Sequence, residues 1–116
     1  MRLQPRLTTA LAALVLAPTL AFAHATKTET TPADGATLAS GPPTLEIAFD
    51  APMRITTLEI ADADGGSYDL DYVRGRPVTD FRAKLPDLPP GTYRVHWRGL
   101  SDDGHPSSGS FSFTIE

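Results

Sequence analysis

The C-terminal stretch "TYRVHWRGLSDDGHPSSGSFSFTIE" (92–116) decides the fold. Apolar residues occupy every second position in its first and last parts, which predicts two β-strands with one face buried and the other in water. The expected buried residues are Tyr93, Val95, Trp97, Phe111, Phe113 and Ile115. Between them, "SDDGHPSSG" (101–109) contains the glycine and proline typical of a turn. The stretch therefore predicts a β-hairpin.

The same alternation continues upstream. It occurs in "TLEIAFD" (44–50) and "TTLEIAD" (56–62), and turn signals such as "TPADGA" (31–36) and "ADGG" (63–66) separate such segments. No stretch has a helical period. The pattern predicts an all-β domain: a single Greek-key, immunoglobulin-like β-sandwich or barrel of about seven strands.

One segment invites a catalytic interpretation. Asp69 and Asp71 alternate with apolar residues and share one face, as a paired general acid and base would. No histidine stands near them in sequence, and a domain of this size has no room for a deep cleft. We therefore expect an edge strand whose charges prevent further pairing.

The N-terminus, "MRLQPRLTTALAALVLAPTLAFAHA" (1–25), has the order of a secretory signal: basic residues, an apolar run, then small residues. The apolar run is too short for a membrane-spanning helix. We expect a signal peptide of residues 1–23 and a mature domain of residues 24–116 that starts with His24 and has no membrane span. Cleavage after Ala25 also satisfies the small-residue rule and would remove His24.

Composition narrows the class of partner. Residues 1–23 contain two of the ten basic residues and none of the fourteen acidic ones, so the mature net charge is −6. An acidic domain without a basic cluster is a poor ligand for nucleic acid. The chain has no cysteine, which excludes disulfides and thiolate metal sites. Small size, acidity and the signal together indicate a periplasmic protein.

Three residues form a candidate metal site. A free α-amine on His24 could close a chelate ring with its own imidazole, and Asp103 and His105 stand at i and i+2, which point the same way in an extended backbone. Tetragonal nitrogen and oxygen donors favour Cu(II) or Ni(II), whereas Zn(II) would accept the same donors in a tetrahedron. The simpler alternative for Asp103 and His105 is a solvated Asx-type turn.

The quoted segments, together with the histidine after the signal, resemble the copper resistance protein CopC family of periplasmic copper-binding β-sandwiches. The resemblance covers 24–116 and is clearest in the Ser-x-Asp-x-His-Pro turn and the Gly-x-Phe-x-Phe strand. It implies a Cu(II) site formed by the His24 amine and imidazole with Asp103 and His105. It also implies that copper is exchanged with an inner-membrane copper transporter or another periplasmic copper protein.

One part of the chain departs from the family. Some members carry a second site, for Cu(I), in a methionine-rich loop with a histidine. The corresponding region, 51–78, holds one methionine, Met53, and no histidine. One thioether is too few for a soft-metal site, so we expect a single Cu(II) site and no Cu(I) site.

The leading hypothesis is a protein that captures and carries Cu(II) in copper resistance or homeostasis, without catalysis. One alternative is a copper-dependent redox enzyme, since an N-terminal histidine chelate also occurs in polysaccharide monooxygenases; the other is a metal-free immunoglobulin-like accessory domain. Ser101 and the other serines flanking His105 lack a Gly-x-Ser-x-Gly elbow and are interpreted as loop solvation. His96 is expected to face solvent beside Arg94 and Arg98.

Overall fold

One long strand organises the molecule. The computed structural model describes residues 2–3 and 28–116, and neither range contains a helix. The strands are β1 (Thr28–Thr31), β2 (Ala36–Leu38), β3 (Thr44–Asp62), β4 (Ser67–Tyr68), β5 (Pro77–Lys84), β6 (Gly91–Ser101) and β7 (Pro106–Ile115). β3 alone has 19 residues. It includes both of the alternating segments, 44–50 and 56–62, that the sequence pattern predicted as separate strands.

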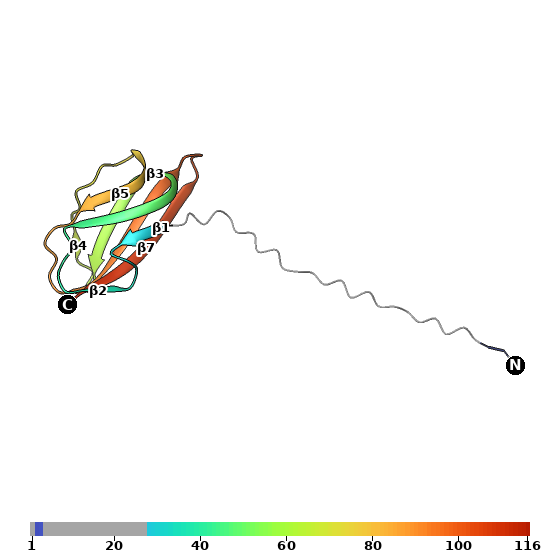
Figure 1. Ribbon diagram of the computed structural model, residues 1–116, viewed down its shortest axis with the longest axis horizontal. Helices are drawn as coiled ribbons and strands as arrows, with labels where there is room; N and C mark the ends of the chain where they lie inside the picture. Colours follow the sequence, from blue (N-terminus) through green and yellow to red (C-terminus); the bar gives the residue numbers. More distant parts are fainter. Residues whose placement is uncertain (1, 4–27) are drawn as a thin grey trace.

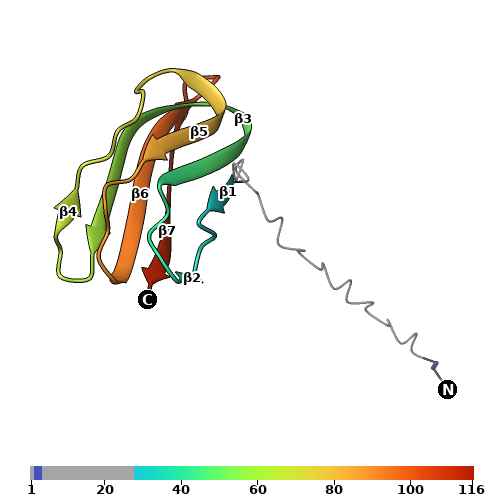
Figure 2. The same cartoon turned by 60° about the vertical axis from the view of Figure 1, so that its left-hand side comes forward.

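β3 takes part in both layers of the sandwich. The strand order is β1-β3-β6-β7-β2, with β4 and β5 also paired to β3. The first part of β3 pairs with β1 and β5, and its second part pairs with β6, β4 and the first residues of β5. The register with β5 shifts between Ala48 and Met53, and the strand bends there from one layer into the other (Figure 1, Figure 2). The prediction of an all-β sandwich of about seven strands is confirmed.

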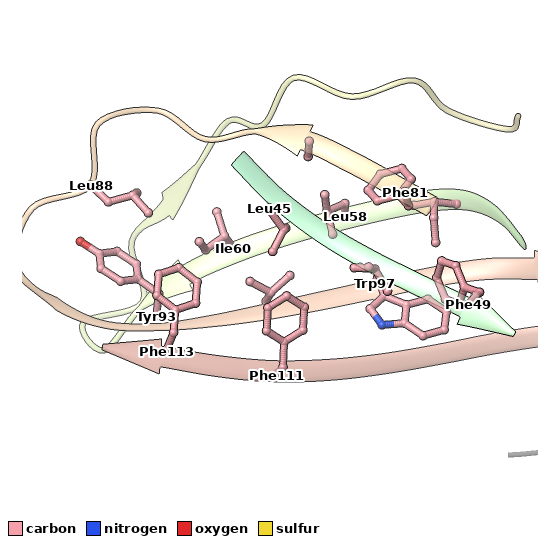
Figure 3. Close-up of a cluster of buried hydrophobic side chains, with 14 of the residues drawn as sticks. Leu45, Phe49, Leu58, Ile60, Phe81, Leu88, Tyr93, Trp97, Phe111 and Phe113 are labelled. Atoms are coloured by element: carbon pink, nitrogen blue, oxygen red, sulfur yellow. The ribbon is translucent and has the colours of Figure 1, made fainter. Parts of the chain in front are cut away.

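The core lies where the two layers face each other. The expected inward positions of β3, β6 and β7 are all buried, and their side chains meet in Figure 3. Phe49 and Trp97 pack edge to face with ring centroids 5.1 Å apart, whereas Tyr93 and Phe113 stack at 5.6 Å. Such aromatic pairs add specific geometry to the burial of apolar area. Core residues outside the alternating segments quoted from the sequence are Met53, Ile55, Phe81, Ala83 and Leu88.

The prediction of an edge strand around Asp69 and Asp71 is wrong. β4 ends at Tyr68, and the following residues make only one isolated bridge, from Asp71 to Lys84. The β3 edge is covered in another way: the Leu58 N–H donates to the Tyr72 hydroxyl at 3.2 Å. A side-chain acceptor satisfies the backbone donor there, so no neighbouring strand is needed.

Gly109 permits close packing of the Trp97 indole in the core. A Cβ atom at position 109 would lie 2.7 Å from Trp97 Nε1, too close for any real contact. Gly109→Ala should lower the free energy of unfolding by about 1–3 kcal/mol, because the indole or the strand must shift to make room. Urea unfolding of the metal-free protein measures this, with Ser108→Ala on the exposed neighbouring position as control. Equal stability of the two variants would contradict the packing.

Candidate metal centre

The β6–β7 hairpin carries two of the three predicted ligands. The last ladder pair is Leu100 with Pro106. The turn is closed by the Ser101 N–H, which donates to the His105 carbonyl at 2.9 Å, and by the Gly104 N–H, which donates to the Ser101 carbonyl at 2.9 Å. Gly104 has φ +83°, a conformation that side chains of L-residues rarely adopt. A glycine is thus required at this position to close the hairpin between the two side chains of interest.

Asp103 and His105 contact each other across this turn. His105 Nδ1 lies 2.7 Å from Asp103 Oδ2, and both side chains are well exposed, at 81% for the imidazole and 65% for the carboxylate. Their convergence was predicted, but for the wrong reason: the backbone forms a turn here rather than an extended strand. Two donors suited to a divalent cation therefore lie side by side on an exposed hairpin.

Asp103 is held as an anion. Its Oδ1 accepts a hydrogen bond from the Ser101 hydroxyl, and its Oδ2 faces the His105 ring. The Ser101 hydroxyl first, and the His105 side chain second, hold the pKa of Asp103 well below its usual range. These contacts therefore favour the ionised carboxylate, the form that can bind a cation.

The contact between Ser101 and Asp103 was not predicted from the sequence. Ser101 was assigned to loop solvation with the other serines, yet its hydroxyl bonds the carboxylate of a candidate ligand. A hydroxyl two residues before an aspartate in a tight turn is a weak signal, because serine is common in turns for several reasons.

His96 lies apart from the hairpin tip. It is half-buried on the outer face of β6, in register with Glu59 on β3 and Ser110 on β7. Five residues along a strand separate it from Ser101, which corresponds to about 16 Å. Its predicted outward orientation is confirmed, and it belongs to a different part of the surface from His105.

The remaining predicted ligand, His24, lies outside the described residues. Within 28–116, no group of three or more histidine, aspartate or glutamate side chains converges closely enough to hold a metal ion. Asp103 and His105 thus form a pair of donors to which a further group has to be added.

The position of Thr28, the first residue of β1, shows at which end of the sandwich that strand begins. Thr28 pairs with Phe49 on β3, and four residues farther along β3, Met53 pairs with Ser101. β1 therefore begins toward the hairpin end of the sandwich, while the C-terminus lies at the opposite end (Figure 1).

Met53 is 1% exposed and packs beside Gly99, where a Cβ atom would lie 3.2 Å from the Met53 sulfur. Its thioether is part of the core and is not accessible to solvent. Across the part of the chain that the structure describes, there is no helix that could cross a bilayer.

Comparisons with known proteins converge on one family. A family model described as the CopC domain matches residues 27–116. Copper resistance protein C of Xanthomonas campestris pv. juglandis is 31% identical over 119 residues, which cover 94% of this chain and 93% of that protein. Copper transport protein CutJ of Bacillus subtilis (strain 168) is 31% identical over 108 residues, or 88% of this chain, and this chain spans only 20% of its length.

The fold is similar to that of a solved structure. The crystal structure of CopC from Methylosinus trichosporium OB3b matches with a TM-score of 0.61 over 76% of this chain and 89% of that chain. At 24% sequence identity, this similarity concerns the fold alone.

Proposed function

This chain belongs to the CopC family, and on that basis we propose that it captures and carries Cu(II) in copper resistance or homeostasis. The observation that carries the proposal is the contact between Asp103 and His105 on the exposed hairpin, where a carboxylate and an imidazole can face one ion. The protein is a binding module and catalyses no reaction. Its cargo is the copper ion itself.

The proposed ligands are the His24 amine and imidazole, Asp103 and His105. Thr28 lies four positions after His24, and an extended chain of four steps spans about 13 Å. The step along β3 from Phe49, which pairs with Thr28, to Met53, which pairs with Ser101, is also four residues. The reach of the N-terminal segment is therefore of the size needed to bring His24 to the hairpin.

The donor chemistry favours the cupric ion. Nitrogen and oxygen donors in a tetragonal arrangement suit Cu(II), and an anionic carboxylate stabilises the higher oxidation state against reduction. Cu(I) prefers sulfur, but the chain has no cysteine and the Met53 thioether is buried in the core. We propose a single Cu(II) site and no Cu(I) site. An ion held in this way resists the redox cycling that a copper oxidase or oxygenase requires.

The proposed setting is the periplasm. Residues 1–23 have the pattern of a secretory signal, and its removal exposes the His24 amine that the site requires. The exposed hairpin leaves the ion accessible to a second protein. We propose that an inner-membrane copper transporter or another periplasmic copper protein exchanges copper with it.

Copper should stabilise the exported protein. At a free Cu(II) concentration 100 times Kd, binding to the folded state adds about 2.7 kcal/mol. For a domain of this size, this corresponds to a rise in Tm of about 10 °C or more. The rise should shrink between pH 7 and pH 5, because protons compete with the metal ion for its nitrogen donors.

Differential scanning calorimetry without Cu(II) and with Cu(II) in excess over the protein measures the effect, and addition of a chelator should reverse it. A Tm that does not change with Cu(II) at pH 7 would refute the proposed function.

A further inference from the structure

Ser101, the last residue of β6, links the sheet to the candidate ligands. Its Oγ donates a hydrogen bond to Asp103 Oδ1, while Oδ2 of the same carboxylate lies 2.7 Å from His105 Nδ1. Oδ1 also accepts a longer hydrogen bond, of 3.4 Å, from the His105 backbone N–H, so the Ser101 hydroxyl is its close donor. We propose that Ser101 is a positioning residue of the copper site: it fixes the Asp103 carboxylate and, through it, the His105 ring before copper arrives. This inference rests on the proposed function.

The Ser101 hydroxyl is anchored more firmly than the groups it orients. Ser101 is half-buried, pairs with Met53 on β3 and closes the turn with its own backbone N–H and carbonyl. Asp103 and His105, in contrast, lie on the exposed turn. A free exposed side chain samples several rotamers, and fixing one of them costs entropy. A hydrogen bond from an anchored donor selects one Asp103 rotamer in advance, so less of that cost falls on metal binding.

The Ser101 hydroxyl has a choice of acceptors. Its Oγ also lies 3.2 Å from the His105 carbonyl oxygen. A hydroxyl has one proton to donate, and an ionised carboxylate is the stronger acceptor. The bond to Asp103 therefore dominates while that carboxylate is ionised, and the backbone carbonyl already receives the Ser101 N–H.

The orientation passes from Asp103 to the imidazole. In the metal-free protein, a neutral His105 ring that donates its Nδ1–H to Asp103 Oδ2 has both its tautomer and its orientation fixed by the carboxylate. An ion bound by both side chains would take the place of that proton, with Nδ1 and Oδ2 as adjacent donors. Without the Ser101 hydroxyl, Oδ1 would keep only the 3.4 Å hydrogen bond from the His105 backbone N–H, so the carboxylate, and with it the imidazole, would be held less firmly. Removal of such orienting partners typically weakens metal affinity about 10- to 100-fold.

The test uses the full-length chain, exported and processed by the producing cell. Ser101→Ala should weaken Cu(II) binding about 10- to 100-fold in a competition titration. Ser101→Thr, which keeps the hydroxyl, should recover most of the affinity. Ser107→Ala removes a hydroxyl from the opposite strand of the same hairpin and should leave the affinity unchanged.

A second measurement separates positioning from a merely structural role. Nitrogen-15 NMR of the metal-free protein should show His105 protonated at Nδ1, and Ser101→Ala should shift the ring toward the other tautomer with no large change in metal-free Tm. Unchanged affinity and tautomer in Ser101→Ala, or an affinity loss that only follows a lower Tm, would overturn the positioning role and leave the copper function intact. Absence of Cu(II) binding by the unaltered protein would overturn both.

Discussion

A protein that begins at His24 is expected to bind Cu(II) about 100 to 10,000 times more tightly than the same protein beginning at Ala21. The amine and the imidazole of an N-terminal histidine belong to one residue, so once one donor is bound, the other binds as an intramolecular group at high effective concentration. In the longer protein, that nitrogen is part of a peptide bond, and its lone pair is delocalised. The free amine then lies three residues away, outside chelating range.

Competition titration of three purified forms measures this effect. The form that begins at Ala21 keeps the His24 imidazole without its amine, and a form that begins at Thr26 lacks both donors. The expected order of affinity places the His24 form first and the Thr26 form last. An intact mass of the exported protein shows which start the cell produces. If the Ala21 and His24 forms bound Cu(II) equally well, the N-terminal chelate would be wrong, whatever the hairpin contributes.

Sequence periodicity predicted the core of the hairpin because burial there is local. Trp97 and Phe111 each lie in segments where every second residue is apolar, and both are buried. The pattern of β5 is less clear: of its residues, only Phe81 and Ala83 are buried, and they alternate with the charged Asp80, Arg82 and Lys84. Two buried positions do not establish a period, so the strand becomes recognisable only through its pairing with β3.

The continuity of β3 was also hidden from sequence. Asp50, Ala51 and Pro52 interrupt the alternation and look like the end of a strand. The strand continues because it leaves one layer at that point and enters the other, and the register with β5 shifts across the same residues. Such a bend is set by contacts with strands distant in sequence, which no local pattern encodes.

Only part of the candidate site could be predicted from the sequence. Asp103 and His105 could be paired from sequence because one turn of the chain brings them together. The place where β1 begins, relative to the hairpin, depends on two separate registers along β3, and only the structure supplies these. The role inferred for Ser101 was missed because serine in a turn has several ordinary explanations. The hydrogen bond to Asp103 distinguishes it from the other serines.

The second large effect is expected from the imidazole of the hairpin. His105→Ala should weaken Cu(II) binding about 100-fold or more, because it removes a nitrogen ligand that no neighbouring side chain can replace. Its stability without metal should stay close to that of the unaltered protein, since the imidazole is 81% exposed and buries little apolar area.

His96→Ala is the matched control, because it removes the same side chain from the same hairpin about 16 Å farther down the strand. Competition titration should separate the two variants, with His96→Ala retaining the affinity of the unaltered protein. The reverse order, with binding lost in His96→Ala and kept in His105→Ala, would move the copper site from the hairpin turn to the outer face of β6. The orienting role proposed for Asp103 would then be wrong as well, because Asp103 contacts His105 and not His96.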